Sequence, residues 1–278
     1  MCGRYAASAD PDQLIEAFEI ELDASAEPAR SVLANPQSPP AGEPDYNIAP
    51  TKRAPVVLSR APRGSAAEEP VRQLRHLTWG LVPSWSKDPK VGVRMINARS
   101  ETVLTSNAYA PAARSRRCLV PAMGWYEWQA SPVVTDVKGK PRKQPFFVRS
   151  PEEEILAFAG LYEFWRDRSV VDPDDPMAWL TTFTIITTDA DPGLDPIHDR
   201  QPLVLDRADW ATWLDPTATD DAELASLLGF ARAGRFTAYP VGRAVSSNRS
   251  NGPHLLDPAP VDELLGVVDP TTGEIIGA

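Results

Sequence analysis

The chain has 278 residues, of which 42% are hydrophobic and 24% are charged, and this composition excludes a disordered or fibrous protein. Its two cysteines, Cys2 and Cys118, cannot form a disulfide framework, so we expect a reducing, cytoplasmic setting. Neither a signal-peptide pattern nor an apolar run of membrane-span length occurs, so we expect no membrane partner.

The net charge of −10 argues at first against nucleic-acid binding, since such domains are usually basic. The distribution of charge matters more than the sum. Acidic residues concentrate in 150–154, 172–175 and 219–223, whereas basic residues outnumber acidic ones between Lys87 and Arg117. A basic face on an acidic protein is therefore permitted.

The first five residues, MCGRY, place a cysteine directly behind the initiator methionine. Because cysteine is small, we expect removal of Met1, which leaves Cys2 with a free α-amine next to its thiol. The alternative is an ordinary frayed terminus with an incidental thiol.

Residues 8–20 show apolar side chains at helical spacing and predict a helix, with Ser8 or Asp10 as N-cap and Pro11 in the first turn. Residues 23–44 are rich in Ala, Pro, Ser and Glu without periodicity, which predicts a loop.

Most of the remaining periodic segments are rich in β-branched and aromatic residues and predict strands. These segments are 54–60, 72–82, 116–128, 144–150, 155–165 and 179–188. Residues 131–143 predict a hairpin connection, 166–177 a long loop, and 206–215 a short helix with Asp206 as a cap. Strands dominate and do not alternate with helices, so we expect one α+β domain rather than a doubly wound fold.

The histidines are the first candidates for catalysis, since the chain contains no metal-binding signature, no phosphate-binding glycine loop and no GxSxG elbow. His76 alternates with leucines in a predicted strand and fits either surface or core. His254 lies in a proline-bounded turn. His198 follows a β-rich run at a strand exit, where sites are often built, and its ring titrates near neutral pH.

Glu127 lies among the aromatic residues of GWYEW (124–128). Desolvation by aromatic neighbours raises the pKa of a carboxylate and suits it to general acid–base work. Strand alternation offers another interpretation, in which Glu127 simply faces solvent.

Asn97 and Arg99 are two residues apart in INARSET and share one face if the segment is extended. Asn97 could then orient a substrate and Arg99 hold a phosphate. The alternative is a turn that leads into a helix capped by Ser100 or Thr102. YNIAPT (46–51) and GLVPSWS (80–86) offer apolar and aromatic side chains for base stacking, but these equally suit a core.

Taken in chain order, several segments together resemble the SRAP family of SOS response-associated peptidases, or abasic site processing proteins. They are MCGR, YNIAPT, WGLVPSW, INARSET, CLVPAMGWYEW, FTIITTDAD, IHDRQPLVL and GRAVSSNRSNGP. The resemblance spans residues 2–258, with polar insertions at about 23–44, 61–71 and 166–178, and leaves 259–278 as a C-terminal tail. It implies an α+β fold of mixed, largely antiparallel β-sheets in a barrel-like arrangement with peripheral helices.

The resemblance implies covalent capture of abasic sites in single-stranded DNA. Matched segment by segment, it places the catalytic group on Cys2, Asn97, Glu127 and His198. It places the DNA-binding surface on Arg4, Asn47, Pro50, Trp85, Arg99, Trp128 and Arg200, and sets Thr187 near the histidine. Since the sequence carries no metal-binding signature, we expect no metal and no cofactor, and we expect a monomer that is cytoplasmic and associates with the nucleoid when bound to DNA.

The chemistry of Cys2 fits this implication. An α-amine with a pKa of about 7.7–8.0 is substantially unprotonated at neutral pH. It attacks the aldehyde of the opened sugar, and the adjacent thiol then closes a thiazolidine ring. We expect Glu127 to shuttle protons, His198 to assist opening of the sugar, and Asn97 to hold the terminus or the sugar.

Other activities remain open from the sequence. The same imine permits strand cleavage, so a lyase side activity is expected. Cys2 could instead act as a protease nucleophile, at minimum in removing its own leader, or could be incidental in a non-catalytic binding domain.

Overall fold

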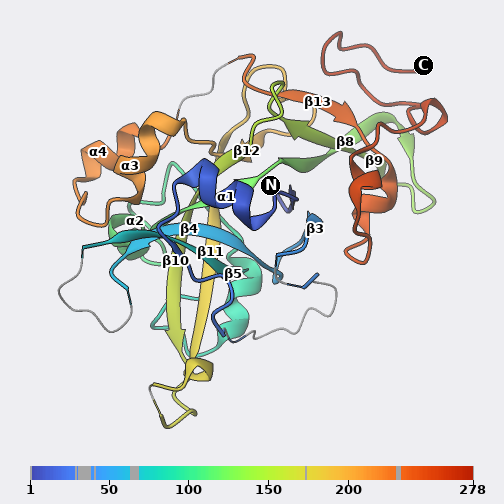
Figure 1. Cartoon of the computed structure of the whole chain (residues 1–278). Helices are drawn as coiled ribbons and strands as arrows, with labels where there is room; N and C mark the ends of the chain where they lie inside the picture. Colours follow the sequence, from blue (N-terminus) through green and yellow to red (C-terminus); the bar gives the residue numbers. More distant parts are fainter. Residues whose placement is uncertain are drawn as a thin grey trace.

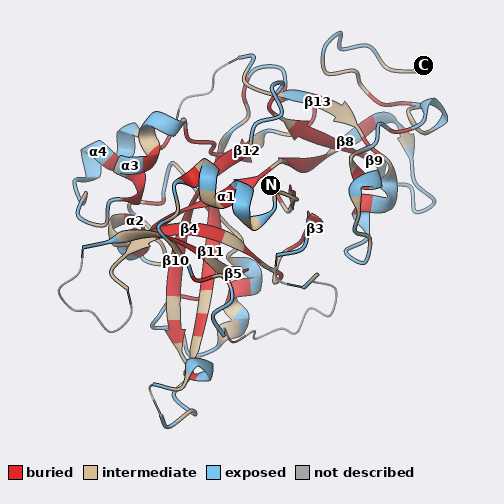
Figure 2. Cartoon of the chain, viewed as in Figure 1, coloured by how far each residue is buried: buried red, intermediate tan, exposed pale blue. Residues whose placement is uncertain are grey.

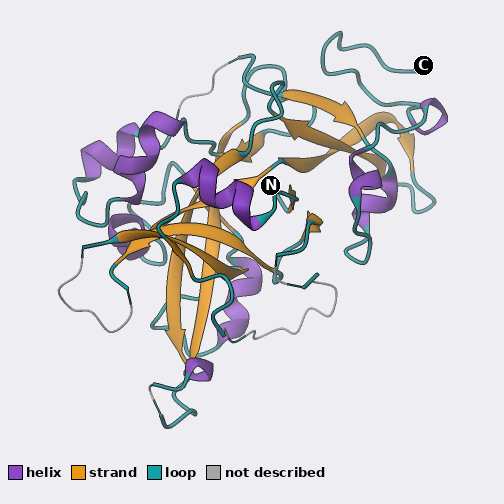
Figure 3. Cartoon of the chain, viewed as in Figure 1, coloured by secondary structure: helices purple, strands orange, loops and turns teal. Residues whose placement is uncertain are grey.

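The computed structural model describes residues 2–28, 30, 39–40, 42–62, 69–172, 174–229 and 233–277. Its strands form two sheets, which occupy the centre of the molecule, while the helices lie around them (Figures 1 and 3). Most neighbouring strands are antiparallel, although β11 pairs in parallel with β5 and β6. The predicted α+β fold with mixed, largely antiparallel sheets is confirmed.

The first sheet has the order β13-β9-β8-β1-β3, and these strands span Thr237–Pro240, Pro141–Arg149, Gly124–Thr135, Arg4–Ala7 and Asp45–Ile48. The N-terminal strand β1 thus lies inside the sheet, with Arg4 opposite Tyr126 of β8 and Tyr5 opposite Ile48 of β3. A terminus paired on both sides is held in place, in contrast to a frayed end.

The second sheet has the order β12-β11-β10-β7-β4-β5-β2, and these strands span Arg200–Pro202, Trp179–Asp189, Leu156–Arg166, Arg117–Ala122, Arg53–Arg60, Val71–Trp79 and Leu22–Asp23. The short strand β6, Asn97–Arg99, pairs with β11. Because Thr182 and Phe183 of β11 also pair with Thr78 and Trp79 of β5, the strands β11, β10, β7, β4 and β5 close into a barrel.

The segment 116–128, predicted as one strand, is two strands in different sheets. β7 pairs with β4 and β10 in the barrel, and β8 pairs with β1 and β9 in the other sheet. The chain crosses between the sheets at Met123, whose N–H donates to the carbonyl of Ala6 at 2.8 Å. Gly124 permits the crossing, since a Cβ there would lie 2.4 Å from the carbonyl oxygen of Val148.

The helices are short and peripheral (Figure 3). Helix α1 spans Pro11–Phe18, and its N-cap is Asp10, whose carboxylate accepts the N–H of Gln13 at 2.9 Å while the Gln13 side chain accepts the N–H of Asp10 at 3.2 Å. The others are α2 Ala110–Ser115, α3 Trp210–Leu214 and α4 Asp221–Ser226. Short 3₁₀ helices span Pro89–Arg94, Pro176–Ala178, Arg207–Asp209, Arg243–Ser246, Pro253–Leu256 and Val261–Glu263.

Two of the helical expectations need correction. Asp206 precedes the 3₁₀ turn at 207–209 but makes no side-chain cap there; its carboxylate instead accepts from the Arg235 guanidinium at 3.1 Å. Ser100 and Thr102 cap no helix, because Asn97–Arg99 is a strand and the next helix begins at Ala110.

Buried residues concentrate along the barrel strands and the middle of the first sheet, while the outer faces of α3 and α4 are exposed (Figure 2). One large apolar cluster contains both Cys2 and Cys118. In the part of the chain that the structure describes, none of the helices has the length and apolar character needed to cross a membrane.

The expected tail, 259–278, is in part integrated into the fold. The side chain of Gln129 in β8 accepts the N–H of Val268 at 2.8 Å and donates to its carbonyl at 2.9 Å. Val267 is buried in the same apolar cluster as Cys2. Residues 266–268 therefore belong to the packed domain rather than to a loose extension. Parts of the expected insertions at 23–44, 61–71 and 166–178 lie outside the described residues.

Candidate functional site

Cys2 is fully buried at the start of the chain, next to the strand that bears Glu127. The Asn97 side chain donates from Nδ2 to the Cys2 carbonyl at 2.8 Å. The Cys2 thiol points back to the carbonyl of Arg4, at 3.8 Å from Sγ. Burial raises the pKa of this thiol well above its usual value, and the negative charge of Glu127 raises it further.

Asn97 is itself fixed by its neighbours. Its strand β6 pairs with β11, with Asn97 opposite Ile185, and the Tyr109 hydroxyl donates to its carbonyl at 3.2 Å. Its Oδ1 atom is buried and accepts no hydrogen bond from the described residues. An acceptor in that position is available to a donor on Cys2 or on a substrate.

Glu127 and His198 line one small cavity, together with Trp125 and Arg200. Glu127 is only 4% exposed, so the solvent-facing interpretation of this residue is wrong. The reason is that both faces of β8 are packed: Trp125, on the same face as Glu127, lies in one apolar cluster, and Tyr126, on the opposite face, lies in another. Burial raises the pKa of Glu127 to about 7, so the carboxyl both donates and accepts protons near neutral pH.

His198 is held by its own loop. The backbone N–H of Arg200 donates to His198 Nδ1 at 3.0 Å. The carboxylate of Asp199 lies 2.9 Å from the same nitrogen. Burial lowers the pKa of His198, which keeps the ring neutral at pH 7.

Arg200 is bound by acidic residues. Its guanidinium forms ion pairs with Glu101 and, at 2.7 Å, with Asp189, and Nη2 donates to the carbonyl of Thr187 at 2.6 Å. Two carboxylates offset its charge, so in this structure it fixes the loop that carries His198. Thr187 is buried in β11, opposite Arg99 of β6, and its side chain has no solvent-facing surface for DNA.

Arg4 and Asn47 form a second group beside Cys2. Arg4 Nη1 donates to Asn47 Oδ1 and to the carbonyl of Val245, each at 2.9 Å. Asn47 is completely buried and donates from Nδ2 to the carbonyls of Ser247 and Ser250, each at 2.9 Å. In this structure Asn47 therefore organises its surroundings instead of offering a surface to DNA.

The remaining predicted DNA-binding residues lie nearer the surface. Trp85 is 67% exposed, on the loop that follows β5. Arg99 is exposed, Pro50 is half-buried in a turn, and Trp128 is half-buried with its Nε1 donating to Ser246 Oγ at 3.1 Å.

Strand β5 ends at Trp79, three residues before the predicted limit at 82. It ends there because the backbones of Gly80 and Gly92 lie in close contact, and the loop that carries Trp85 starts at this point. A Cβ at Gly80 would lie 2.5 Å from the carbonyl oxygen of Gly92, and a Cβ at Gly92 would lie equally close to that of Gly80. The φ of +125° at Gly80 also requires glycine.

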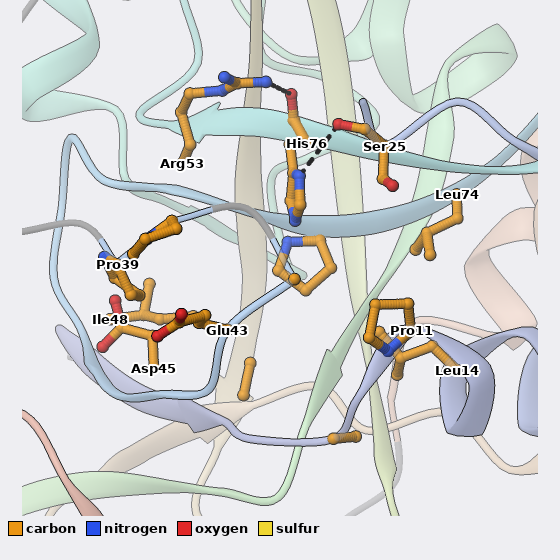
Figure 4. A pocket seen from close by; sticks show the side chains of 15 residues that line it. Pro11, Leu14, Ser25, Pro39, Glu43, Asp45, Ile48, Arg53, Leu74 and His76 are labelled. Carbon is orange, nitrogen blue, oxygen red and sulfur yellow. Dashed lines mark hydrogen bonds between the residues drawn. The ribbon is translucent and has the colours of Figure 1, made fainter. Parts of the chain in front are cut away.

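Two larger cavities lie away from the predicted residues. One of about 160 Å³ lies beside α1, β3 and β5, and His76 projects into it with Nδ1 3.2 Å from the Ser25 carbonyl (Figure 4). Another, of about 440 Å³, is lined by Arg60, Arg75 and Phe164. None of the predicted catalytic or DNA-binding residues lines either cavity. Among the described residues, no three His, Cys, Asp or Glu side chains gather in a way that could hold a metal ion.

Several contributors escaped sequence reasoning. Glu101 and Asp189 anchor Arg200, Tyr109 anchors Asn97, and Lys52 supports Asn47 through a buried ion pair with Asp45. Glu101 lies inside INARSET, so its place in that segment was a usable signal. The other contacts join segments far apart in the chain and leave no local pattern.

The fold and its site define a class of α+β proteins organised around a buried amino-terminal segment, with β1 inside a sheet and Cys2 against the barrel core. The chain belongs to the SRAP family: the family described as SOS response associated peptidase matches residues 1–248.

Relatives of this chain include the abasic site processing protein YoqW of Bacillus subtilis (strain 168), which is 33% identical over 259 residues, covering 92% of this chain and 99% of YoqW. The abasic site processing protein HMCES of Rattus norvegicus is 31% identical over 288 residues, covering 93% of this chain and 76% of HMCES. A crystal structure of a protein from Bacteroides thetaiotaomicron superposes with a TM-score of 0.71 at 23% identity, covering 93% of this chain and all of that one, and shows the same fold.

Proposed function

We propose that this protein captures abasic sites in single-stranded DNA by forming a covalent crosslink through Cys2. The observation that carries the proposal is the placement of Cys2: its carbonyl is held by Asn97 at 2.8 Å, and Glu127, with a pKa of about 7, lies within electrostatic range of its thiol. The names of the relatives, which are abasic site processing proteins, support the same role.

The first step requires the α-amine of Cys2, which becomes available once Met1 is removed. The amine attacks the aldehyde of the ring-opened sugar and gives a carbinolamine, which loses water to form an imine. Glu127 takes the proton that the amine nitrogen carries after it has added to the aldehyde carbon and returns one to the leaving hydroxyl, because its pKa lies near the working pH. His198 forms a hydrogen bond to the sugar ring oxygen as the ring opens.

The second step closes the ring. The Cys2 sulfur adds to the imine carbon, its proton passes to the imine nitrogen, and a thiazolidine results with net loss of one water from the two reactants. The raised pKa of the thiol keeps it protonated until this step, which leaves the amine as the first nucleophile. Elimination of the 3′-phosphate from the same imine would appear as lyase activity.

The protonated, fully buried thiol distinguishes this chemistry from a cysteine protease, whose nucleophile is a thiolate of lowered pKa. One chain supplies every residue of the site, so the reaction needs no second copy. The free thiol also requires a reducing compartment such as the cytoplasm.

The test uses an end-labelled single-stranded oligonucleotide with one abasic site, resolved on a denaturing gel. The wild-type protein is expected to give a slower covalent band, and Cys2→Ala none. Cys2→Ser should give only an imine that needs borohydride to survive the gel, since its hydroxyl cannot form a thiazolidine. The matched control is Cys118→Ala, which removes the other buried cysteine and should crosslink like wild type. A band of equal intensity from Cys2→Ala would refute the proposal.

A further inference from the structure

The loop Ser246–Asn251 is bonded to the N-terminal site more firmly than a surface loop requires. It belongs to the segment GRAVSSNRSNGP, to which the proposed chemistry gives no role. One buried side chain, Asn47, donates from Nδ2 to three carbonyls around it: those of Val245 at 3.3 Å, Ser247 at 2.9 Å and Ser250 at 2.9 Å. In Figure 1 this segment, coloured orange-red, lies beside β3.

Further bonds connect the loop to residues near Cys2. Arg4, two residues from Cys2, donates to the carbonyl of Val245 at 2.9 Å. Trp128, the residue after Glu127, donates to Ser246 Oγ at 3.1 Å. The loop and Val245, the residue before it, therefore contact residues near both Cys2 and Glu127.

A buried ion pair between Lys52 and Asp45 holds Asn47 in place. Lys52 Nζ lies 2.8 Å from Asp45 Oδ2 and donates to the Asn47 carbonyl at 2.9 Å, and Asp45 Oδ1 accepts the Asn47 N–H at 2.9 Å. Burying two charges costs desolvation free energy. A buried pair is therefore expected where the position of a neighbouring segment, here the loop held by Asn47, must be fixed.

The side chains that this loop presents to solvent suit a phosphate. Ser246, Ser247, Asn248 and Arg249 are all exposed, and the loop contains no acidic residue. Arg249 forms no ion pair with any carboxylate of the described residues, whereas Arg243 nearby lies 3.3 Å from Glu263. Arginine, serine and asparagine are the side chains that commonly contact the DNA backbone.

We propose that Arg249 binds a backbone phosphate of single-stranded DNA next to the abasic nucleotide, with Asn47 as the positioning residue that holds its loop. This deepens, and rests on, the proposed capture of abasic sites. Asn47 is completely buried and cannot contact DNA itself, so its part in DNA binding is to position the loop that carries Arg249.

The test measures binding separately from chemistry. Fluorescence anisotropy is recorded with a labelled single strand that carries a tetrahydrofuran abasic analogue, which has no aldehyde and cannot crosslink. Arg249→Ala should bind about tenfold more weakly, as expected for loss of one charged hydrogen bond. Its plot of log affinity against log salt should lose about 0.7 in slope, the value for one phosphate contact to a single strand. At saturating abasic DNA, Arg249→Ala should crosslink at the wild-type rate.

The matched control is Arg243→Ala, which removes an exposed arginine of the same segment that is paired with Glu263 and should leave affinity and salt slope unchanged. Arg249→Lys should keep the slope. If Arg249→Ala binds the analogue with the same affinity and the same salt slope as the wild type, the inference is overturned, even if the protein crosslinks to abasic DNA. Conversely, a wild-type protein that binds the analogue but never crosslinks would refute the proposed chemistry and leave the phosphate contact standing.

Discussion

Glu127→Gln should make the folded protein more stable than the wild type at alkaline pH while slowing its crosslinking to abasic DNA. The wild-type carboxyl is buried, and its pKa is raised to about 7 by that burial. In the unfolded chain the same group titrates at about 4.3. Between these two values the folded state holds a proton that the unfolded state has released.

The sign follows from proton linkage. Because the folded state binds more protons in this window, the free energy of unfolding falls as pH rises from about 4.3 to about 7 and is flat above it. The total loss is about 4 kcal/mol at about 1.4 kcal/mol per pKa unit. Glutamine has the same shape and does not ionise, so the free energy of unfolding of Glu127→Gln should not fall in this way as pH rises.

The assay is urea unfolding of both proteins at pH 5 and pH 8. The stability difference in favour of Glu127→Gln should grow by about 2.5 kcal/mol from pH 5 to pH 8. Crosslinking by the same variant should be slowed by about two orders of magnitude, the range for loss of a general acid–base group.

Glu163→Gln is the matched control. Glu163 is also a buried strand carboxylate, but it is paired with Arg116 at 2.9 Å, so its neutralisation should destabilise the protein at both pH values. A stability difference for Glu127→Gln that does not change with pH would show that Glu127 is ionised in the folded state throughout, and the proton-shuttle assignment would fall.

Three further outcomes are expected. Trp85→Ala should leave the urea midpoint unchanged, because the ring is 67% exposed, yet weaken anisotropy-measured binding of single-stranded DNA about fivefold or more through lost base stacking; unchanged binding would exclude Trp85 from the DNA surface. Asn97→Ala should slow gel-measured crosslinking about a hundredfold at saturating DNA by releasing the Cys2 carbonyl, and a wild-type rate would contradict the positioning role. Lys52→Met should lower the free energy of unfolding by about 3–5 kcal/mol by leaving Asp45 buried without its partner, and the double variant with Asp45→Asn should recover part of it in urea titrations.

Much of the fold could be predicted from local sequence. Strand segments such as 54–60 and 179–188 carry their own signal, because β-branched and aromatic residues suit a pleated, half-buried surface. The N-cap at Asp10 follows from residues three apart. The break at 123–124 was missed, because what divides 116–128 is the approach of Val148 to Gly124, two residues that are distant in sequence.

The candidate site divides in the same way. The sequence by itself determined which side chains are present and in what order, and the order of its segments was sufficient to indicate the SRAP family. Only the tertiary structure decided their states: Glu127 is buried because both faces of its strand are packed, and Asn47 is turned inward by Arg4 and the carbonyls of 245–250. The guanidinium of Arg200 forms ion pairs with Glu101 and Asp189. Burial and charge pairing depend on contacts between residues far apart in the chain, and local periodicity contains no information about them.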